Sequence, residues 1–86
     1  MEFQSNADLF EAIKKLQSSL SSSGNEKAGE LLGEGMLSLN GLTDGWALLL
    51  ESINTLNKRY GATLSQHQCD ELNKIHKAVH QVVYRA

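Results

Sequence analysis

The sequence predicts an all-α fold, a small antiparallel four-helix bundle. Apolar residues recur every three or four positions along most of the 86-residue chain, which is the spacing of one face of a helix. No segment alternates apolar and polar residues as a half-buried strand does. The chain has seven glycines and no proline, and Gly24, Gly41 and Gly61 fall where helices are expected to end. We expect a single domain, residues 1–86, whose core a second copy can complete.

The first helix is expected at about residues 6–20. Ser5 or Asn6 can serve as its N-cap, and Asp8 lies in the first turn, where a carboxylate interacts favourably with the helix dipole. The helix leads into residues 19–25, a serine-rich segment that we expect to be a flexible connector. Its expected core residues are Leu9, Ile13, Leu16 and Leu20.

The second helix is expected at about residues 26–40. Asn25 is a suitable N-cap, and Gly41 is a suitable left-handed residue after the C-terminus. The connection to the next helix is very short, which predicts that the two helices form an antiparallel hairpin. Its expected core residues are Ala28, Leu31, Leu32, Gly35 and Leu39.

Three glycines lie inside this second helix. Each costs about 1 kcal/mol relative to alanine in a helix interior, so a packing reason for them is expected. On a helical wheel, Gly35 falls on the core face, where a neighbour such as Trp46 could approach closely. Gly29 and Gly33 fall on the opposite, outer face beside Leu37.

The third and fourth helices are expected at about residues 43–60 and 65–84. Thr43 is a suitable N-cap for the third helix. Ser65 and Gln68 have the spacing of a capping box at the start of the fourth. The expected core residues of the third helix are Leu42, Trp46, Leu49, Ile53, Leu56 and Tyr60. Those of the fourth are Leu72, Ile75, Val79, Val82 and Val83.

Charge and composition restrict the class of protein. The net charge of −2 argues against a general nucleic-acid binder, because such domains are usually strongly basic. No apolar run is long enough to cross a membrane, and the first residues lack the pattern of a signal peptide. The single cysteine, Cys69, cannot form an internal disulfide. These observations predict a cytoplasmic protein that does not bind membranes.

The charge is unevenly distributed along the chain. Residues 1–54 hold eight acids and three lysines, a net charge of −5, whereas residues 55–86 hold five basic residues and two acids, a net charge of +3. The two halves can attract each other within one bundle, or each can contact a partner of opposite charge.

A row of polar side chains on the fourth helix is the strongest candidate for chemistry. Cys69, Asn73, His76 and His80 are spaced by four, three and four residues, so they share one side of the helix. Two histidines four residues apart can bind one zinc ion, which makes His76 and His80 a candidate metal site. Cys69 lies about 10 Å along the axis from His76, too far to share that ion or to form a catalytic pair. We therefore expect no enzyme and no cofactor.

The leading functional hypothesis is a non-enzymatic helical protein–protein interaction module that associates with itself. Its expected contact residues are Gly29, Gly33 and Leu37 on the second helix and Leu48, which lies off the core seam of the third. A second apolar face usually indicates a protein partner or a second copy of the chain. The serine-rich connector also allows the first helix to exchange between two copies.

Two alternatives remain. One is a metal-binding protein that uses His76 and His80. The other is a DNA-binding regulator that uses the basic fourth helix, with Lys74, Lys77 and Arg85. Asp70 and Glu71 interrupt this basic face, and few side chains on it could read bases.

Overall fold

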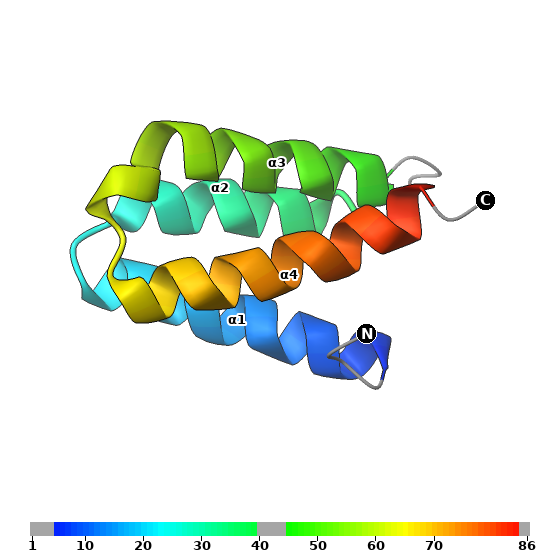
Figure 1. Ribbon diagram of the computed structural model, residues 1–86, viewed down its shortest axis with the longest axis horizontal. Helices are drawn as coiled ribbons and strands as arrows, with labels where there is room; N and C mark the ends of the chain where they lie inside the picture. The colour runs from blue at the N-terminus through cyan, green and yellow to red at the C-terminus, as the bar shows by residue number, and fades with distance from the viewer. Residues whose placement is uncertain (1–4, 40–44, 85–86) are drawn as a thin grey trace.

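The computed structural model describes residues 5–39 and 45–84, and four helices account for most of them (Figure 1). The elements in chain order are α1 (Asn6–Ser22), α2 (Glu26–Leu37), α3 (Gly45–Tyr60), the 3-10 helix η1 (Gly61–Thr63) and α4 (Gln66–Tyr84). The predicted all-α class and the four helices are confirmed. Within the described ranges there is no strand.

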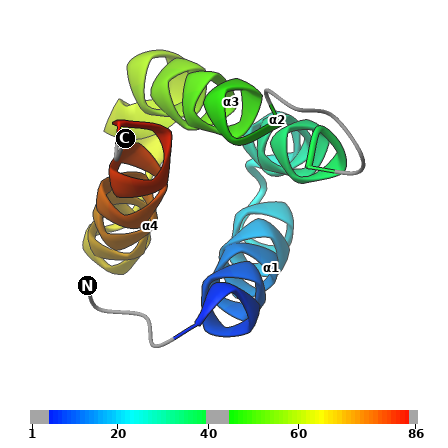
Figure 2. The same ribbon diagram turned by 90° about the vertical axis from the view of Figure 1, so that its right-hand side faces the viewer.

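The four helices form an antiparallel bundle with a square cross-section (Figure 2). α2 packs against both α1 and α3, and α4 packs against the same two helices from the opposite corner. α1 and α3 therefore lie diagonally, as do α2 and α4. Because every consecutive pair is antiparallel, the start of α1 and the end of α4 lie at the same end of the bundle.

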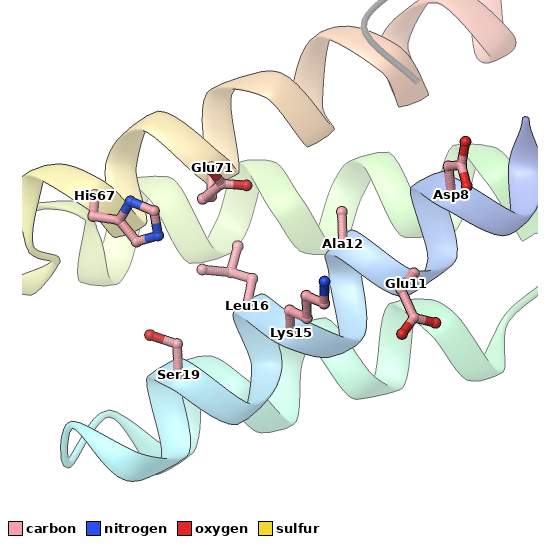
Figure 3. Close-up of a pocket in the computed structure, with 8 residues that line it drawn as sticks. All are labelled: Asp8, Glu11, Ala12, Lys15, Leu16, Ser19, His67 and Glu71. Atoms are coloured by element: carbon pink, nitrogen blue, oxygen red, sulfur yellow. The ribbon is translucent and has the colours of Figure 1, made fainter. Parts of the chain in front are cut away.

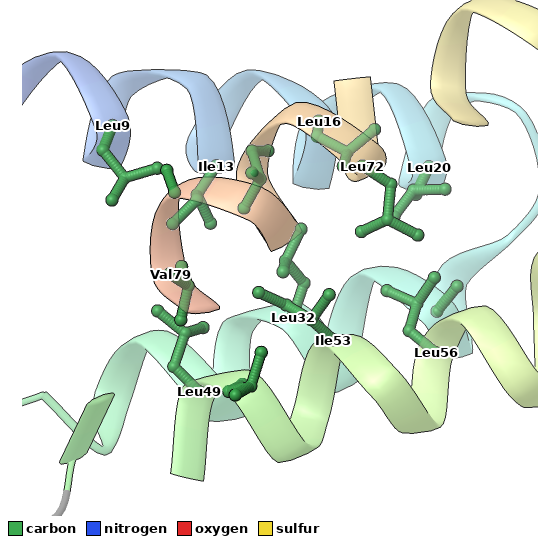
Figure 4. Packing of buried hydrophobic residues seen from close by; sticks show 14 residues of the cluster. Leu9, Ile13, Leu16, Leu20, Leu32, Leu49, Ile53, Leu56, Leu72 and Val79 are labelled. Atoms are coloured by element: carbon green, nitrogen blue, oxygen red, sulfur yellow. The ribbon is translucent and has the colours of Figure 1, made fainter. Parts of the chain in front are cut away.

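The core runs along the bundle axis and receives side chains from all four helices (Figure 4). Most of the predicted core residues are buried, which confirms the helix faces inferred from the spacing. The buried apolar residues are Leu9, Ile13, Leu16, Leu20, Ala28, Leu32, Leu49, Leu50, Ile53, Leu56, Leu72, Ile75, Ala78 and Val79. Five other predicted core residues only border this cluster, namely Leu31, Leu39, Trp46, Tyr60 and Val83. Val82 is half-buried and lies outside it.

An aromatic pair joins the two diagonal helices α1 and α3. The rings of Phe10 and Trp46 are stacked, with centroids 5.8 Å apart and an interplanar angle of 24°. Both side chains are half-buried. The pair therefore covers the core at the end of the bundle where α1 begins.

Residues 19–25 are mostly helical, contrary to the predicted connector. α1 continues through Ser22, and Ser23 caps it. Gly24 then adopts a positive φ of 92°. The amide of Gly24 donates to the Ser21 carbonyl and that of Asn25 to the Leu20 carbonyl, which together form a Schellman motif. The serines extend the helix because this C-terminal motif satisfies its last carbonyls.

α2 ends at Leu37, earlier than the predicted residue 40. The Ser38 hydroxyl donates to the Glu34 carbonyl at 3.1 Å, and this local bond satisfies one of the last carbonyls of the helix. The expected caps Gly41 and Thr43 lie outside the described residues, as does Leu42. α3 then begins at Gly45, whose Cα faces the backbone of Ser38 and Leu39 with no room for a Cβ.

Asn25 precedes α2 as predicted, but its side chain does not cap the helix. Instead, Asn25 Oδ1 lies 3.3 Å from the Thr63 hydroxyl, which is also 2.7 Å from the Tyr60 carbonyl oxygen. Asn25 Nδ2 lies 3.5 Å from the Thr63 carbonyl oxygen. The side chain therefore links the α1–α2 turn to η1. The capping prediction for Asn25 is wrong, because its side chain contacts Thr63 instead of the free backbone amides at the start of α2.

Gln68 is the buried polar side chain of the core, with only 4% of its surface exposed. The predicted capping box is present: Gln68 N donates to Ser65 Oγ at 3.1 Å, and Ser65 N donates to Gln68 Oε1 at 3.0 Å. The amide nitrogen of Gln68 forms its hydrogen bonds outside the capping box. Gln68 Nε2 donates to Ser19 Oγ at 3.0 Å and to Ser23 Oγ at 3.1 Å. One side chain therefore caps α4 and holds the end of α1.

We expect Gln68→Ala to lower the free energy of unfolding by about 2 kcal/mol, because it removes the cap of α4 and the hydrogen bonds from the Gln68 amide to Ser19 and Ser23 of α1. Ser65→Ala removes only the hydroxyl of the box and should cost about 1 kcal/mol. Urea denaturation followed by circular dichroism measures both losses.

The matched control is Gln66→Ala, since Gln66 is exposed and bonds only to Asp70 on its own helix. It should change the stability by less than about 0.5 kcal/mol. Equal losses for Gln66→Ala and Gln68→Ala would contradict the bridging role.

Candidate interaction surface

Leu37 is the apolar side chain on α2 that the fold leaves uncovered. It is 68% exposed and lies at the last residue of the helix. This agrees with its predicted position away from the core. Among the described residues, the other large apolar side chain left exposed is Tyr84, at 69%.

Gly29 and Gly33 do not lie on an outer face, so that part of the prediction is wrong. Gly29 is buried, and a Cβ added to it would meet Ser21 Oγ at 3.0 Å and the Gln17 carbonyl oxygen at 3.3 Å. A Cβ on Gly33 would meet only the amide end of Gln17, at 2.8 Å. Both glycines therefore face α1. A helical wheel shows one buried face, whereas α2 has two because it packs against two helices.

Gly35 lies on the core face as predicted, but Trp46 is not among its nearest neighbours. A Cβ there would lie 2.8 Å from Leu49 Cδ1 and 3.0 Å from Ser52 Cβ. The three interior glycines therefore divide between two contacts of α2. Gly29 and Gly33 lie against α1, and Gly35 lies against α3.

A shallow groove lies between α1 and α2 beside Leu37. Figure 1 shows that α1 diverges from α2 toward the end of the bundle where α1 begins, and Figure 2 shows the same separation end-on. This α1–α2 groove has a volume of about 460 Å³. Its lining residues are Lys14, Gln17, Glu30, Gly33, Glu34, Met36 and Leu37. Two of the predicted contact residues, Gly33 and Leu37, are thus brought together.

Leu48, the fourth predicted contact residue, is half-buried on α3. It is not among the residues that line the α1–α2 groove. Leu48 therefore lies outside this groove.

A second groove separates α1 from α4 (Figure 3). Its volume is about 440 Å³. Its lining residues are Asp8, Glu11, Ala12, Lys15, Leu16, Ser19, His67 and Glu71. Most of these side chains are charged or polar, and no sequence pattern pointed to them, because the groove depends on how two helices distant in sequence pack.

The polar row of α4 is divided among separate contacts. His76 Nε2 lies 3.0 Å from Asn54 Oδ1 of α3. The rings of His76 and His80 are 5.9 Å apart between centroids, and those of His80 and Tyr84 are 4.5 Å apart. Cys69 Sγ lies 3.8 Å from the Gly61 carbonyl oxygen, so it is directed to η1 rather than to the histidines.

In the described part of the chain, no three His, Cys, Asp or Glu side chains form a cluster that could hold a metal ion. The metal site at His76 and His80 stays a prediction, and the metal content of protein purified without chelator tests it.

Comparison with protein-family models, curated proteins and solved structures finds no match for this chain. Among the described helices, none is both long enough and apolar enough to span a bilayer. The basic face of α4 is partly neutralised, since Lys74 Nζ lies 3.7 Å from Glu71 Oε1. Arg85, the third residue of the DNA-binding hypothesis, lies outside the described residues.

Tyr84 is an exposed residue that the sequence analysis did not select. The sequence analysis ended the fourth helix at this residue and assigned it no function. The signal that could have identified it is its spacing, because it follows His80 by one helical turn and continues the row of polar side chains.

Alanine substitutions on the two buried faces of α2 should have opposite effects on the free energy of unfolding. Gly35→Ala should destabilise the protein by about 1–3 kcal/mol, because the added methyl forces α2 away from α3. Gly33→Ala should leave the stability unchanged or raise it by up to about 1 kcal/mol, because only the mobile end of Gln17 must move and alanine favours the helix.

Thermal and urea unfolding of the two variants, recorded at low protein concentration, provide the comparison. Loss of stability in Gly33→Ala equal to that in Gly35→Ala would show that the α1–α2 contact is as tight at Gly33 as the α2–α3 contact is at Gly35.

Proposed function

We propose that this chain is a non-enzymatic helical interaction module that associates with itself through the α1–α2 groove. The observation that supports this is the position of Leu37. Its side chain is 68% exposed at the edge of a groove that Gly33 and Met36 also line. A single exposed leucine is common, but one beside an apolar hollow offers a surface that another helix can cover.

Covering Leu37 removes apolar surface from water. Full burial of a leucine side chain contributes about 1.5–3 kcal/mol. A symmetric contact buries the same residue in both copies, so the contribution is made twice. The neighbouring Gly33 has no side chain of its own, and the amide end of Gln17 lies beside it in the groove.

The proposal is a binding role rather than a catalytic one, because its evidence is an apolar surface flanked by charges. A cytoplasmic location fits this role. The free thiol of Cys69 is half-buried and suits a reducing compartment. Accessory and regulatory proteins of this size commonly act through such surfaces.

We expect the wild-type protein to have a solution mass above the 9.5 kDa of one chain, and Leu37→Glu to return it to the monomer. A carboxylate at this position would have to be desolvated in the contact. Size-exclusion chromatography with light scattering measures the mass, and circular dichroism verifies that the variant is folded.

Tyr84→Glu is the matched control, because Tyr84 is equally exposed but lies on α4, across the bundle from α2. It should leave the mass unchanged. A wild-type protein that is monomeric at its highest soluble concentration would contradict the proposed function, as would an oligomer that is insensitive to Leu37→Glu.

A further inference from the structure

The two walls of the α1–α2 groove carry opposite charges. α1 contributes Lys14, and α2 contributes Glu30 and Glu34. All three side chains are exposed. None of them forms an ion pair within residues 5–39 and 45–84, where the one ion pair present joins Lys74 to Glu71.

Lys14 and Glu34 lie at nearly the same level along the groove. Gly29 is opposite the turn of α1 from Gln17 to Ser21, since a Cβ on Gly29 would lie 3.3 Å from the Gln17 carbonyl oxygen and 3.0 Å from Ser21 Oγ. The middle of that turn is residue 19. In the antiparallel pair, Lys14 lies five residues beyond residue 19 and Glu34 five residues beyond Gly29, both toward the end where α1 begins. Glu30 lies only one residue beyond Gly29, so its level differs from that of Glu34 by about 6 Å at 1.5 Å per residue.

This arrangement of charges is complementary to itself under one particular rotation. A two-fold axis that runs along the groove, in the plane of contact, places α1 of each copy over α2 of the other. The α1 side of the groove, which carries Lys14, then faces the α2 side of the other copy, which carries Glu30 and Glu34. Symmetry repeats this contact at a second position. A two-fold axis across the groove would instead place α1 over α1 and α2 over α2, so that like charges would meet, which is unfavourable.

We propose that the α1–α2 groove is the interface of a closed two-fold homodimer, in which Lys14 of each copy pairs with Glu34 of the other. This inference rests on the proposed function, to which it adds the occupant and its orientation. The same rotation places Leu37 of each copy over α1 of the other. The contact uses the same surface on both chains, so it closes at two copies and does not propagate into a filament.

Charge reversal tests the pairing. Lys14→Glu places three acids around one groove, and Glu34→Lys removes the partner of Lys14. Each single variant should weaken the dimer by about tenfold or more, because like charges then face each other at two symmetric positions. The double variant Lys14→Glu/Glu34→Lys restores opposite charges and should recover most of the wild-type affinity. Sedimentation equilibrium gives the dissociation constants.

The matched controls reverse charges that lie outside the α1–α2 groove. Lys15→Glu makes the same charge change one residue away, in the α1–α4 groove, and Glu51→Lys reverses an exposed acid on α3. Neither should change the dissociation constant by more than about twofold at moderate ionic strength, where distant charges are screened.

The outcomes separate this inference from the proposed function. If the wild type associates and Leu37→Glu abolishes association, but the double charge variant is no tighter than the single ones, the module stands and the two-fold pairing is overturned. If Lys14→Glu changes the unfolding free energy of the monomer and not the dissociation constant, the lysine acts within one chain and the inference fails. A species larger than two copies also overturns it, and a strictly monomeric wild type overturns both.

Discussion

The packing of the whole bundle depends on α2, which must contact two neighbours closely at once. Its interior glycines make this geometry accessible. Gly29 lets the backbone of α1 approach, and Gly35 does the same for Leu49 and Ser52 of α3. Each glycine costs helix stability, about 1 kcal/mol, and the close contacts offset that cost. α4 then completes the square by packing on the same two helices.

The two ends of the bundle are held differently. At the end where α1 finishes, Gln68 joins the start of α4 to the last turn of α1, and Asn25 is bonded to Thr63 of η1. At the other end, the ring of Phe10 on α1 is stacked on that of Trp46 on α3. α1 diverges from α2 toward this second end (Figure 1). The α1–α2 groove and the exposed Leu37 are consequences of that divergence.

The candidate surface could be predicted only in part. Leu37 was identified because it lies off the apolar stripe of its own helix, and its exposure agrees with this. Gly29 was assigned to the same surface for the same reason, yet it is buried. The periodicity of one helix reports which side is apolar, but a glycine has no side chain and carries no such signal. Lys14 was not selected, because its position opposite Glu34 depends on the register between α1 and α2.

The sequence by itself determined the number of helices, their approximate bounds, their core faces and the capping box at Ser65 and Gln68. These features depend on contacts within a few residues, so spacing and residue type are sufficient to predict them. The tertiary structure alone decided that Gln68 reaches α1, that Asn25 bonds to Thr63 instead of capping α2, and that the interior glycines serve two interfaces. It also decided where the grooves lie. Each of these depends on which helices become neighbours, and that follows from packing many side chains together rather than from the pattern along any one helix.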